Sequence, residues 1–347
     1  MRVLPTGSLV VGKLPKGCEL CQRGLKTVIF VTGMCPRRCF YCPLSRERRR
    51  DVFLVNEVKL KADNPKFVNS LISEIYRSAS LGASLTGGDP LIRLERTLHV
   101  IQVIREFLGD EFHLHLYTTG KTLTVNVVKK LERVGLDELR VHPDLNDLPK
   151  IAEALRGSAI EYGLEVPALP RSERMLTRLV AKAEKMGFKF VNINELEFSE
   201  ENSVALLQRG YTMSDDYISA IGSKETAAKV LKRAEREGIG IDLHFCPVIV
   251  KDKYQTGLRL FRRGQVTAKP YERVTDFGTI IRLEVTNMRE MLKGVPKALY
   301  KLRDGKVLTS IDMLPLIKGK EVYLVEELSS SDRLEIGRER IHLAEET

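Results

Sequence analysis

Three cysteines stand close together near the start of the chain, at Cys35, Cys39 and Cys42 in the segment Cys-Pro-Arg-Arg-Cys-Phe-Tyr-Cys. This C-x3-C-x2-C spacing supplies three thiolate ligands, which can hold three irons of a [4Fe–4S] cluster and leave the fourth iron open. A small molecule bound to the open iron could accept an electron there. A zinc site needs four ligands, and a ferredoxin-type run has another spacing and a fourth cysteine. The spacing therefore favours the cluster over a zinc knuckle or three core cysteines.

A glycine-rich turn, Gly87-Gly88-Asp89-Pro90, ends the next apolar segment, about 45 residues after the triplet. The glycines allow the backbone to approach a ligand with no Cβ atom in the way, and the acidic side chain favours a nearby cation. On its own this sequence is an ordinary turn. Its position after the triplet indicates that it is a second part of the same site.

The triplet, with Tyr41 just before its last cysteine, and the Gly-Gly-Asp-Pro turn resemble the signature of the radical S-adenosylmethionine (radical SAM) enzymes. In that family the open iron chelates the amino and carboxylate groups of S-adenosylmethionine (SAM). The reduced cluster cleaves SAM into methionine and a 5′-deoxyadenosyl radical, which abstracts hydrogen from a substrate. The segment 165–170 is similar to a strand of the branch that includes the pyruvate formate-lyase activating enzymes and related archaeal-type proteins.

The resemblance implies a role for each matching residue. The cluster ligands would be Cys35, Cys39 and Cys42, Tyr41 would abut the adenine, and the methionyl end would be held by Gly87, Gly88, Asp89 and Pro90. The family more often has Glu where this chain has Asp89. The resemblance also implies an oxidoreductase- or transferase-type enzyme that receives electrons from an external donor of the ferredoxin or flavodoxin type.

Polar side chains also crowd two later strand ends. The hydroxyls of Thr118 and Thr119 could reach the ribose or carboxylate of SAM. Asn194, Glu195 and Glu197 follow one another at the end of another predicted strand. Because α/β barrels place their chemistry at the C-terminal ends of the strands, these last three are the predicted catalytic residues. Taken singly, each is as well explained by a structural hydrogen bond.

Alternating elements of the α/β type would position these residues. Short apolar runs predict strands at 27–32, 83–86, 113–118, 138–142, 164–169, 189–193 and 240–245. Apolar residues at three- and four-residue spacing predict helices near 66–80, 93–108, 122–134, 148–161, 171–186 and 223–237. The resemblance implies a partial TIM-type (β/α)6 barrel, so we expect one of the seven strands to lie outside it. Pro167 argues against a fully paired strand at 164–169.

The predicted organisation has three parts. Residues 1–26 are an N-terminal segment, residues 27–250 form the barrel, and residues 251–347 form a small basic, β-rich module. Within the barrel, 195–222 is irregular and is expected to be an inserted loop or lid. Short β-like runs in the module lie at 279–286, 298–302, 306–310 and 321–326, and the charged residues 328–347 are expected to be helical or frayed.

The remaining cysteines suggest a second site. Cys18 and Cys21 form a C-x2-C pair in an expected loop, and His244 and Cys246 lie two residues apart on an expected strand, which directs both side chains to one face. Four such ligands suffice for a structural zinc or an auxiliary iron–sulfur cluster. The alternatives are that His244 and Cys246 belong to the core and that Cys18 and Cys21 only flank the active site.

Charge and composition bear on the substrate. The net charge is +10, and residues 251–274 carry seven basic and two acidic side chains with three aromatic residues among them. Basic groups with interleaved aromatic rings suit RNA, although a solvated surface explains them equally well. Six clustered cysteines favour metal ligation in a reducing compartment, and the lack of an apolar run of about 20 residues excludes a membrane span. We therefore expect a cytoplasmic protein.

Three hypotheses for function follow. The first is a radical SAM enzyme that modifies RNA, most plausibly tRNA, through residues 251–274. The second is an activase or another peptide- or protein-modifying radical SAM enzyme, which the segment 165–170 favours. The third is non-enzymatic, a zinc-stabilised RNA-binding protein. Small-molecule metabolism also remains open.

Overall fold

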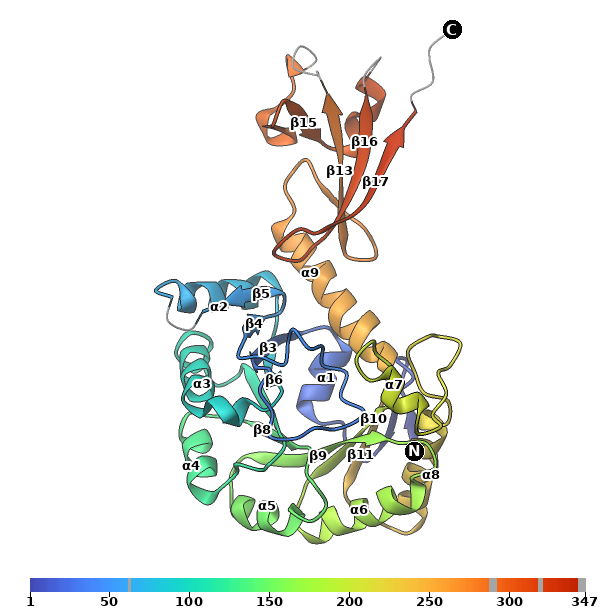
Figure 1. Cartoon of the computed structure of the whole chain (residues 1–347). Coiled ribbons are helices and arrows are strands. Elements are labelled where there is room, and N and C mark those ends of the chain that lie inside the picture. Colours follow the sequence, from blue (N-terminus) through green and yellow to red (C-terminus); the bar gives the residue numbers. More distant parts are fainter. Residues whose placement is uncertain (62–63, 287–291, 318–320, 343–347) are drawn as a thin grey trace. The chain divides into compact units, whose positions relative to one another are not determined.

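The structure of the chain is a computed structural model that describes residues 1–61, 64–286, 292–317 and 321–342 (Figure 1). By its internal contacts the chain divides into two compact units. Unit 1 comprises residues 1–74 and 80–255, and unit 2 comprises residues 75–79 and 256–347. In the part of the chain that is described, no helix is long and apolar enough to cross a membrane.

Unit 1 is built on one sheet of eleven strands. In spatial order these are β1 (Arg2–Val3), β2 (Leu9–Val11), β11 (Asp242–Cys246), β10 (Phe190–Glu195), β9 (Glu161–Ala168), β8 (Glu138–Val141), β7 (His113–Thr118), β6 (Gly82–Gly87), β3 (Lys26–Thr32), β4 (Phe53–Val55) and β5 (Val58–Leu60). The seven strands from β3 to β11 run parallel. Antiparallel strands border them on both sides, β4 beside β3 and β2 beside β11.

All seven predicted strands are present in this sheet. The expectation that one of them lies outside the barrel is wrong, because β11 pairs with β10 over five residue pairs, from Phe190–Asp242 to Asn194–Cys246. The N-terminal strand β2 then pairs with β11 and covers its free edge. Among the described residues no pairing joins β3 to β11, so the curved sheet is open on that side.

Helices that connect the parallel strands lie on the outer side of the curved sheet (Figure 1). They are α3 (Leu94–Leu108), α4 (Val125–Arg133), α5 (Leu148–Leu155), α6 (Glu173–Lys185) and α8 (Ser223–Arg236), and α2 (Phe67–Arg77) precedes β6. In α8 the apolar residues at three- and four-residue spacing, Ala227, Val230, Leu231 and Ala234, are all fully buried. This is the amphipathic pattern that packs a helix against a sheet.

The short helix α1 (Lys16–Gln22) lies on the inner side of the sheet, within its curve (Figure 1). A Cβ atom on Gly17 would come within 2.6 Å of His115 Nδ1 and 2.9 Å of an Arg140 side-chain nitrogen. Only glycine therefore lets this helix approach the inward-facing side chains so closely. Cys18 and Cys21 lie on α1, which corrects the expectation that they stand in a loop.

Pro167 lies inside β9 without disrupting it, because one neighbouring strand has already ended. β8 pairs with β9 only as far as Val141–Leu164, whereas β10 continues to pair up to Glu195–Ala168. From residue 165 onward β9 thus has a partner on one side alone. A proline, which has no N–H to donate, is tolerated at such an edge.

Unit 2 contains an antiparallel sheet. Its strands are, in order, β14 (Tyr300–Arg303), β15 (Lys306–Thr309), β13 (Thr279–Thr286), β16 (Val322–Leu328) and β17 (Glu335–Ile341), with β12 (Arg273–Val274) beside β13. The core of the sheet is apolar and is formed by Leu283, Val285, Val307, Met313, Ile317 and Val322. Residues 335–341 form a strand, so the expectation of a helical or frayed end is wrong there; residues 343–347 lie outside the described part.

The predicted module begins with a helical segment, and its four predicted β-like runs coincide with β13, β14, β15 and β16. A π-helical stretch, Val250–Gly257, continues into α9 (Leu258–Thr267). Two basic residues of the segment, Arg259 and Arg263, are each only 3% exposed, and its aromatic residue Tyr271 is 9% exposed. The sequence signal was misleading because arginines that pack inside the protein contribute the same formal charge as arginines on a surface.

Candidate active site

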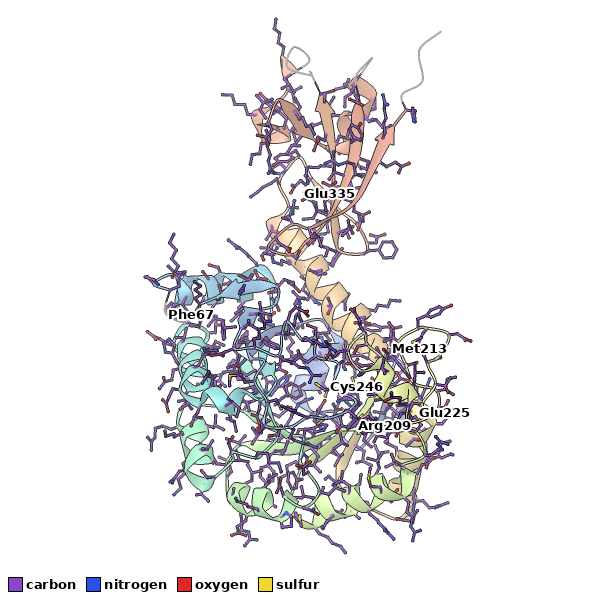
Figure 2. The ribbon with its side chains drawn as sticks, viewed as in Figure 1. Phe67, Arg209, Met213, Glu225, Cys246 and Glu335 are labelled. Atoms are coloured by element: carbon purple, nitrogen blue, oxygen red, sulfur yellow. The ribbon has the colours of Figure 1, made fainter. Side chains whose placement is uncertain are left out.

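A cavity of about 410 Å3 lies on the inner side of the unit 1 sheet. Side chains from seven strands, from α1 and from the loop after β3 line it. Within β7, β8 and β9, the inward-facing positions alternate with outward-facing ones at the period of two that a strand imposes. Figure 2 shows the side chains that fill this interior, with Cys246 among them.

The cysteine triplet stands on the loop that follows β3, and all three thiols are free and line the cavity. Cys35 is exposed, and Cys39 and Cys42 are partly exposed. The Cys42 N–H donates to the Cys39 carbonyl over 3.1 Å, which closes a turn between these two ligands. Nothing in the described chain packs these thiols away from a ligand, so they are available for a cluster.

The spacing of the three thiols fits a cluster better than a single zinc ion. Zinc–sulfur bonds of about 2.3 Å in a tetrahedral site would bring the sulfur atoms to about 3.8 Å from one another. The three sulfur atoms of the triplet do not all lie within 4.8 Å of one another. A [4Fe–4S] cluster binds each thiolate to a different iron, which requires wider spacing.

The glycine turn after β6 is joined to the residues just before the triplet. Gly88 N–H donates to the Thr32 carbonyl and Asp89 N–H to the Met34 carbonyl, each over 2.8 Å. A Cβ atom on Gly88 would lie 2.3 Å from the Met34 oxygen, and Gly87 has a φ of +134°. The two glycines therefore let the turn and the cysteine loop lie against each other. Gly87 and Gly88 also line the cavity.

Asp89 and Pro90 do not line the cavity, contrary to the role that the resemblance implies for them. Asp89 is fully buried, and its carboxylate accepts hydrogen bonds from the Thr119 hydroxyl at 2.6 Å, the Thr119 N–H at 3.0 Å and the Thr118 hydroxyl at 3.0 Å. It also accepts from the Leu91 N–H. Asp89 thus fixes the end of β7 beside the end of β6 and is already saturated with donors.

The same contacts change the expectation for Thr118 and Thr119. Both residues line the cavity, but both hydroxyls donate to Asp89. Their hydroxyl oxygens can still accept a hydrogen bond from a ligand, since a hydroxyl has two acceptor lone pairs. The two threonines are therefore positioned as acceptors.

Tyr41 lines the cavity and is held at both ends. Its hydroxyl lies 2.8 Å from His142 Nε2, and its carbonyl accepts a hydrogen bond from the Asn202 side chain at 3.0 Å. Burial lowers the pKa of His142 to about 4. The ring is therefore neutral near pH 7, and its Nε2 can accept a hydrogen bond from the Tyr41 hydroxyl. The inserted segment thus reaches back through Asn202 to hold the cysteine loop.

The inserted segment contains α7 (Ser203–Leu207), and packs on the cysteine loop through apolar and aromatic contacts. Phe40 and Tyr211 stack with ring centroids 6.4 Å apart, and the Arg209 guanidinium lies 4.3 Å from the Phe40 centroid. Figure 2 labels Arg209 and Met213 on this segment. The segment that sequence alone describes as a lid is anchored to the candidate cluster site.

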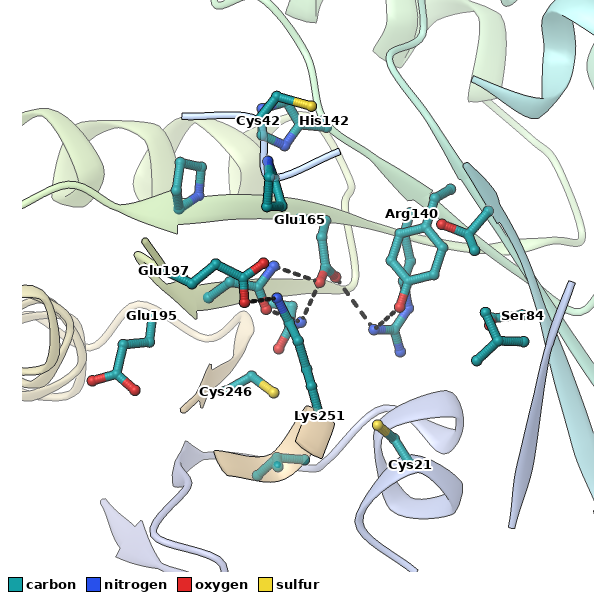
Figure 3. Close-up of a pocket in the computed structure, with 18 of the residues that line it drawn as sticks. Cys21, Cys42, Ser84, Arg140, His142, Glu165, Glu195, Glu197, Cys246 and Lys251 are labelled. Carbon is teal, nitrogen blue, oxygen red and sulfur yellow. Dashed lines mark hydrogen bonds and ion pairs between the residues drawn. The ribbon is translucent and has the colours of Figure 1, made fainter. Parts of the chain in front are cut away.

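The three predicted catalytic residues at the end of β10 all line the cavity, and each is already hydrogen-bonded (Figure 3). Asn194 donates to a Glu165 oxygen at 2.7 Å, and Glu195 accepts from the Val248 N–H at 2.9 Å. Glu197 accepts from the Lys251 ammonium at 2.9 Å. Burial raises the pKa of Glu195, whose hydrogen-bond donor is a backbone N–H rather than an ammonium group as for Glu197.

Sequence analysis missed the central element of the cavity, a buried charge network on β8 and β9. Arg140, 2% exposed, pairs with Glu138 at 2.5 Å. It also pairs with Glu165 at 3.2 Å (Figure 3). Glu165 also accepts from the Asn192 and Asn194 amides, both at 2.7 Å. Opposite charges and hydrogen bonds of this kind are what make buried ions tolerable. The missed signal was the run of polar residues at every second position of strands that otherwise look apolar.

Lys251 was assigned to a basic RNA-binding segment, and the structure corrects this. Its ammonium lies in the cavity wall, 2.9 Å from Glu197 (Figure 3). Lys26, at the start of β3, is a second lysine of the wall and is 4% exposed. Helical geometry rather than composition decides which charges of 251–274 reach a surface.

The four ligands of the predicted second site all line the cavity, but their ligand atoms do not gather closely enough for a single zinc ion. Cys18 accepts from Arg140 at 3.2 Å, Cys21 lies 3.0 Å from the Gln255 amide oxygen, and Cys246 packs against Cys21 and Val250. No three of the four ligand atoms come within 4.8 Å of one another. Burial raises the pKa of Cys18 to about 12 and lowers that of His244 to about 3.

One group of possible ligands does converge, namely His113, His115 and Glu138 beneath the cavity. Lys26 and Arg140 are close enough to lower the pKa of His115, although burial is the larger cause. Two neighbouring cations oppose a divalent ion. Glu138 is also engaged by Arg140 and by the Gly17 N–H at 3.2 Å. We therefore regard this group as part of the charge network.

Comparison with known proteins shows which family this chain is similar to. Residues 29–162 match the profile of the Radical SAM superfamily. Over 283 residues the chain is 38% identical to a protein of Methanocaldococcus jannaschii provisionally named a glycyl-radical enzyme activating enzyme. This match covers 78% of the chain and 73% of the relative.

Two solved structures are similar at lower identity. One is Streptococcus suis SuiB bound to the precursor peptide SuiA, with a TM-score of 0.46, 12% identity and 63% of the chain covered. The chain spans about half of SuiB, 48% of its length. The other is coproporphyrinogen III oxidase (HemN) from Escherichia coli, with a TM-score of 0.41, 10% identity, and coverage of 92% of this chain and 71% of HemN.

Proposed function

The chain belongs to the radical SAM superfamily, and from that premise we propose that it is an activating enzyme that abstracts a hydrogen atom from a glycine residue of a partner protein. The observation that carries the proposal is the 38% identity to the Methanocaldococcus jannaschii protein over 73% of its length. Membership makes the chain an enzyme that uses a [4Fe–4S] cluster and SAM. This leaves the non-enzymatic hypothesis of a zinc-stabilised RNA-binding protein without support.

When bound, the cluster and SAM supply a 5′-deoxyadenosyl radical. We assign the cluster to Cys35, Cys39 and Cys42, because their thiols are free, face the cavity and are spaced too widely for one zinc ion. The backbone of Gly87 and Gly88 and the hydroxyls of Thr118 and Thr119 would receive SAM beside them. Asp89 acts behind this surface by holding the two threonines in place.

The opposite wall of the cavity suits a peptide. It presents four side-chain amides, Gln22, Asn192, Asn194 and Gln255. Each makes hydrogen bonds to neighbouring side chains. An amide offers two N–H groups and two carbonyl lone pairs, so Asn194 and Gln255 keep capacity for a main chain. A glycine residue needs no side-chain pocket, so amide partners for its neighbours would suffice to hold it. Glu195 and Glu197 stand on the same side and would orient the segment that carries the glycine.

The hypothesis of RNA modification loses part of the observation on which it rested, although Lys253, Lys269 and Arg273 of the basic segment are exposed. Of the basic residues in 251–274, Lys251 faces the cavity and Arg259 and Arg263 are buried. The comparisons name no RNA substrate. The second metal site at Cys18, Cys21, His244 and Cys246 also has little support, and we propose that these residues form the wall of the substrate cavity.

The proposal is tested by anaerobic electron paramagnetic resonance. Reduced enzyme with an intact cluster is incubated with SAM and a glycyl-radical enzyme, with a low-potential ferredoxin or flavodoxin as electron donor. The expected result is a protein-based glycyl radical that requires SAM and is absent with the Cys39→Ala variant. Formation of 5′-deoxyadenosine that rises with added tRNA but not with the protein would contradict the proposal.

A further inference from the structure

Unit 2 contains a further cavity, of about 490 Å3, which shares no lining residue with the cavity of unit 1. It lies among α9, the edge strand β14 and the turn between β16 and β17. Most of its lining is charged or hydroxylic. Since pockets for ordinary metabolites are lined mainly by apolar side chains, this composition indicates a highly charged ligand.

The lining has a large surplus of positive charge. Between residues 263 and 333 it includes six basic side chains and only two acidic ones, Glu272 and Glu327. The basic residues are Arg263, Lys269, Arg282, Lys301, Arg303 and Arg333. Two glutamates cannot balance six basic side chains, so pairing within the sheet does not account for the positive charge of the lining. A concave surface with one sign of charge concentrates ligands of the other sign.

The inner basic groups are held in fixed positions. Arg282, 6% exposed, donates to Glu327 at 2.6 Å, and Arg333 bridges Glu327 at 3.0 Å and Glu272 at 2.5 Å. Arg263, 3% exposed, donates to the Ser329 carbonyl. Arg282 Nε is buried and has no hydrogen-bond partner in the described part of the chain. The guanidinium groups are thus oriented in advance, as anion recognition requires.

The outer basic groups stand at the rim. Lys301 and Arg303 are two residues apart on β14, so both side chains lie on the same face of this edge strand. Both are exposed, as is Lys269 after α9. The Ser330 and Ser331 hydroxyls also line the cavity. Fixed guanidinium groups, mobile ammonium groups and hydroxyls together match closely spaced phosphate oxygens.

We infer that this cavity is a binding site for consecutive phosphate groups, such as an RNA strand or a free polyphosphate carries. The site lies in unit 2 and takes only part of its lining from the segment 251–274, with Arg263 and Lys269, while Arg282, Lys301, Arg303 and Arg333 lie outside that segment. It stands whether or not the activating-enzyme proposal holds, because it shares no residue with the cavity of unit 1.

The test measures binding to the full chain without SAM or reductant. Two probes are used, a fluorescent single-stranded RNA followed by anisotropy and inorganic tripolyphosphate followed by calorimetry. The site-directed variant is K301E/R303E, and the matched control is K293E/K297E, which reverses two exposed lysines of the same unit outside the cavity. All four side chains are exposed, so both variants are expected to fold.

The expected result is that the wild type binds at least one probe and that K301E/R303E weakens this binding at least tenfold, while the control changes it less than twofold. If RNA is the ligand, the slope of log affinity against log salt also falls by roughly 1.4, the value for two lost phosphate contacts on a single strand. Binding of tripolyphosphate alone would identify a small polyphosphate as the ligand. Failure of both probes, or equal weakening by both variants, would overturn the inference.

Discussion

Two groups of three cysteines face the same cavity and differ in almost every physical respect. Cys35, Cys39 and Cys42 stand on a loop, partly or fully exposed. Cys18, Cys21 and Cys246 lie on a helix and a strand and are buried. The first group has thiols available for a ligand, whereas the thiols of the second are engaged by Arg140, Gln255 and apolar packing.

The difference shows that cysteine spacing alone does not define a metal site. C-x2-C on a loop leaves the thiols free to take the geometry of a cluster, but the same spacing on α1 directs both thiols into a packed interior. Burial also favours the neutral thiol, which is a poor ligand. Exposed cysteines on a loop thus suit a cofactor site, whereas buried cysteines form part of a cavity wall.

The largest effect on activity is expected at the exposed cysteines of the loop, Cys35, Cys39 and Cys42. Cys39→Ala should reduce bound iron and 5′-deoxyadenosine formation to background, because three thiolates are the minimum for a cluster with one open iron. Since Cys39 is partly exposed, the free energy of unfolding of the cluster-free protein should change by less than about 1 kcal/mol. Iron analysis and urea unfolding check the two halves of this prediction. If this variant kept a full cluster, Cys39 would not be a ligand, and the contrast between exposed and buried cysteines would be wrong.

Replacement of Arg140, which donates to the buried Cys18, should have the largest effect on stability. Arg140→Met leaves Glu138 and Glu165 buried without the guanidinium that pairs with both, and we expect a loss of about 3–5 kcal/mol in the free energy of unfolding. The matched control is Lys130→Met, whose pair with Glu95 is exposed and should cost less than about 1 kcal/mol. Similar losses in the two variants, measured in urea, would mean that the network is not structural.

A smaller effect is expected within the buried group itself. Cys246→Ala removes packing against Cys21 and Val250 and should lower the free energy of unfolding by about 1–2 kcal/mol. Iron should stay near four atoms per chain and zinc should be absent, because we assign no metal to this side of the cavity. A loss of iron or zinc in this variant would restore the second metal site.

The smallest effect is expected at Asp51, at the end of the loop that carries the cysteine triplet. Hydrogen bonds from Arg96, Thr32 and Arg93 lower the pKa of Asp51 to about 2. A carboxyl with a lowered folded-state pKa stabilises the protein above its unfolded pKa near 4, and this contribution is lost as the pH falls towards 2. Between pH 5.5 and 3.0 the wild type should therefore lose about 0.5–1 kcal/mol more than Asp51→Asn, after allowance for solvent screening. Equal losses in urea unfolding would show that Asp51 does not hold the loop.

The sequence predicts the parts of this molecule that depend on local pattern. The seven parallel strands, the helices between them and the two motifs at Cys35–Cys42 and Gly87–Pro90 follow from periodicity and spacing. The family assignment rests on the match of residues 29–162, a range that includes both motifs, and on the 38% identity to the relative.

What the sequence does not predict depends on contacts between distant residues. Asp89 is saturated by Thr118 and Thr119 about 30 positions away, and Arg140 links strands β8 and β9 through Glu165. Lys251 belongs to the cavity because a helix turns it toward Glu197. Composition cannot separate such a lysine from one on a surface, so the basic residues counted in 251–274 overstate the charge that this segment exposes.

The most direct test of the account follows hydrogen from the substrate. A glycyl-radical enzyme labelled with deuterium at its glycine α-carbons is incubated anaerobically with the reduced enzyme and SAM, and the 5′-deoxyadenosine is analysed by mass spectrometry. The account predicts that 5′-deoxyadenosine gains one deuterium, and that none is gained with an unlabelled partner. Unlabelled 5′-deoxyadenosine, formed at a rate that the partner protein does not change, would contradict it.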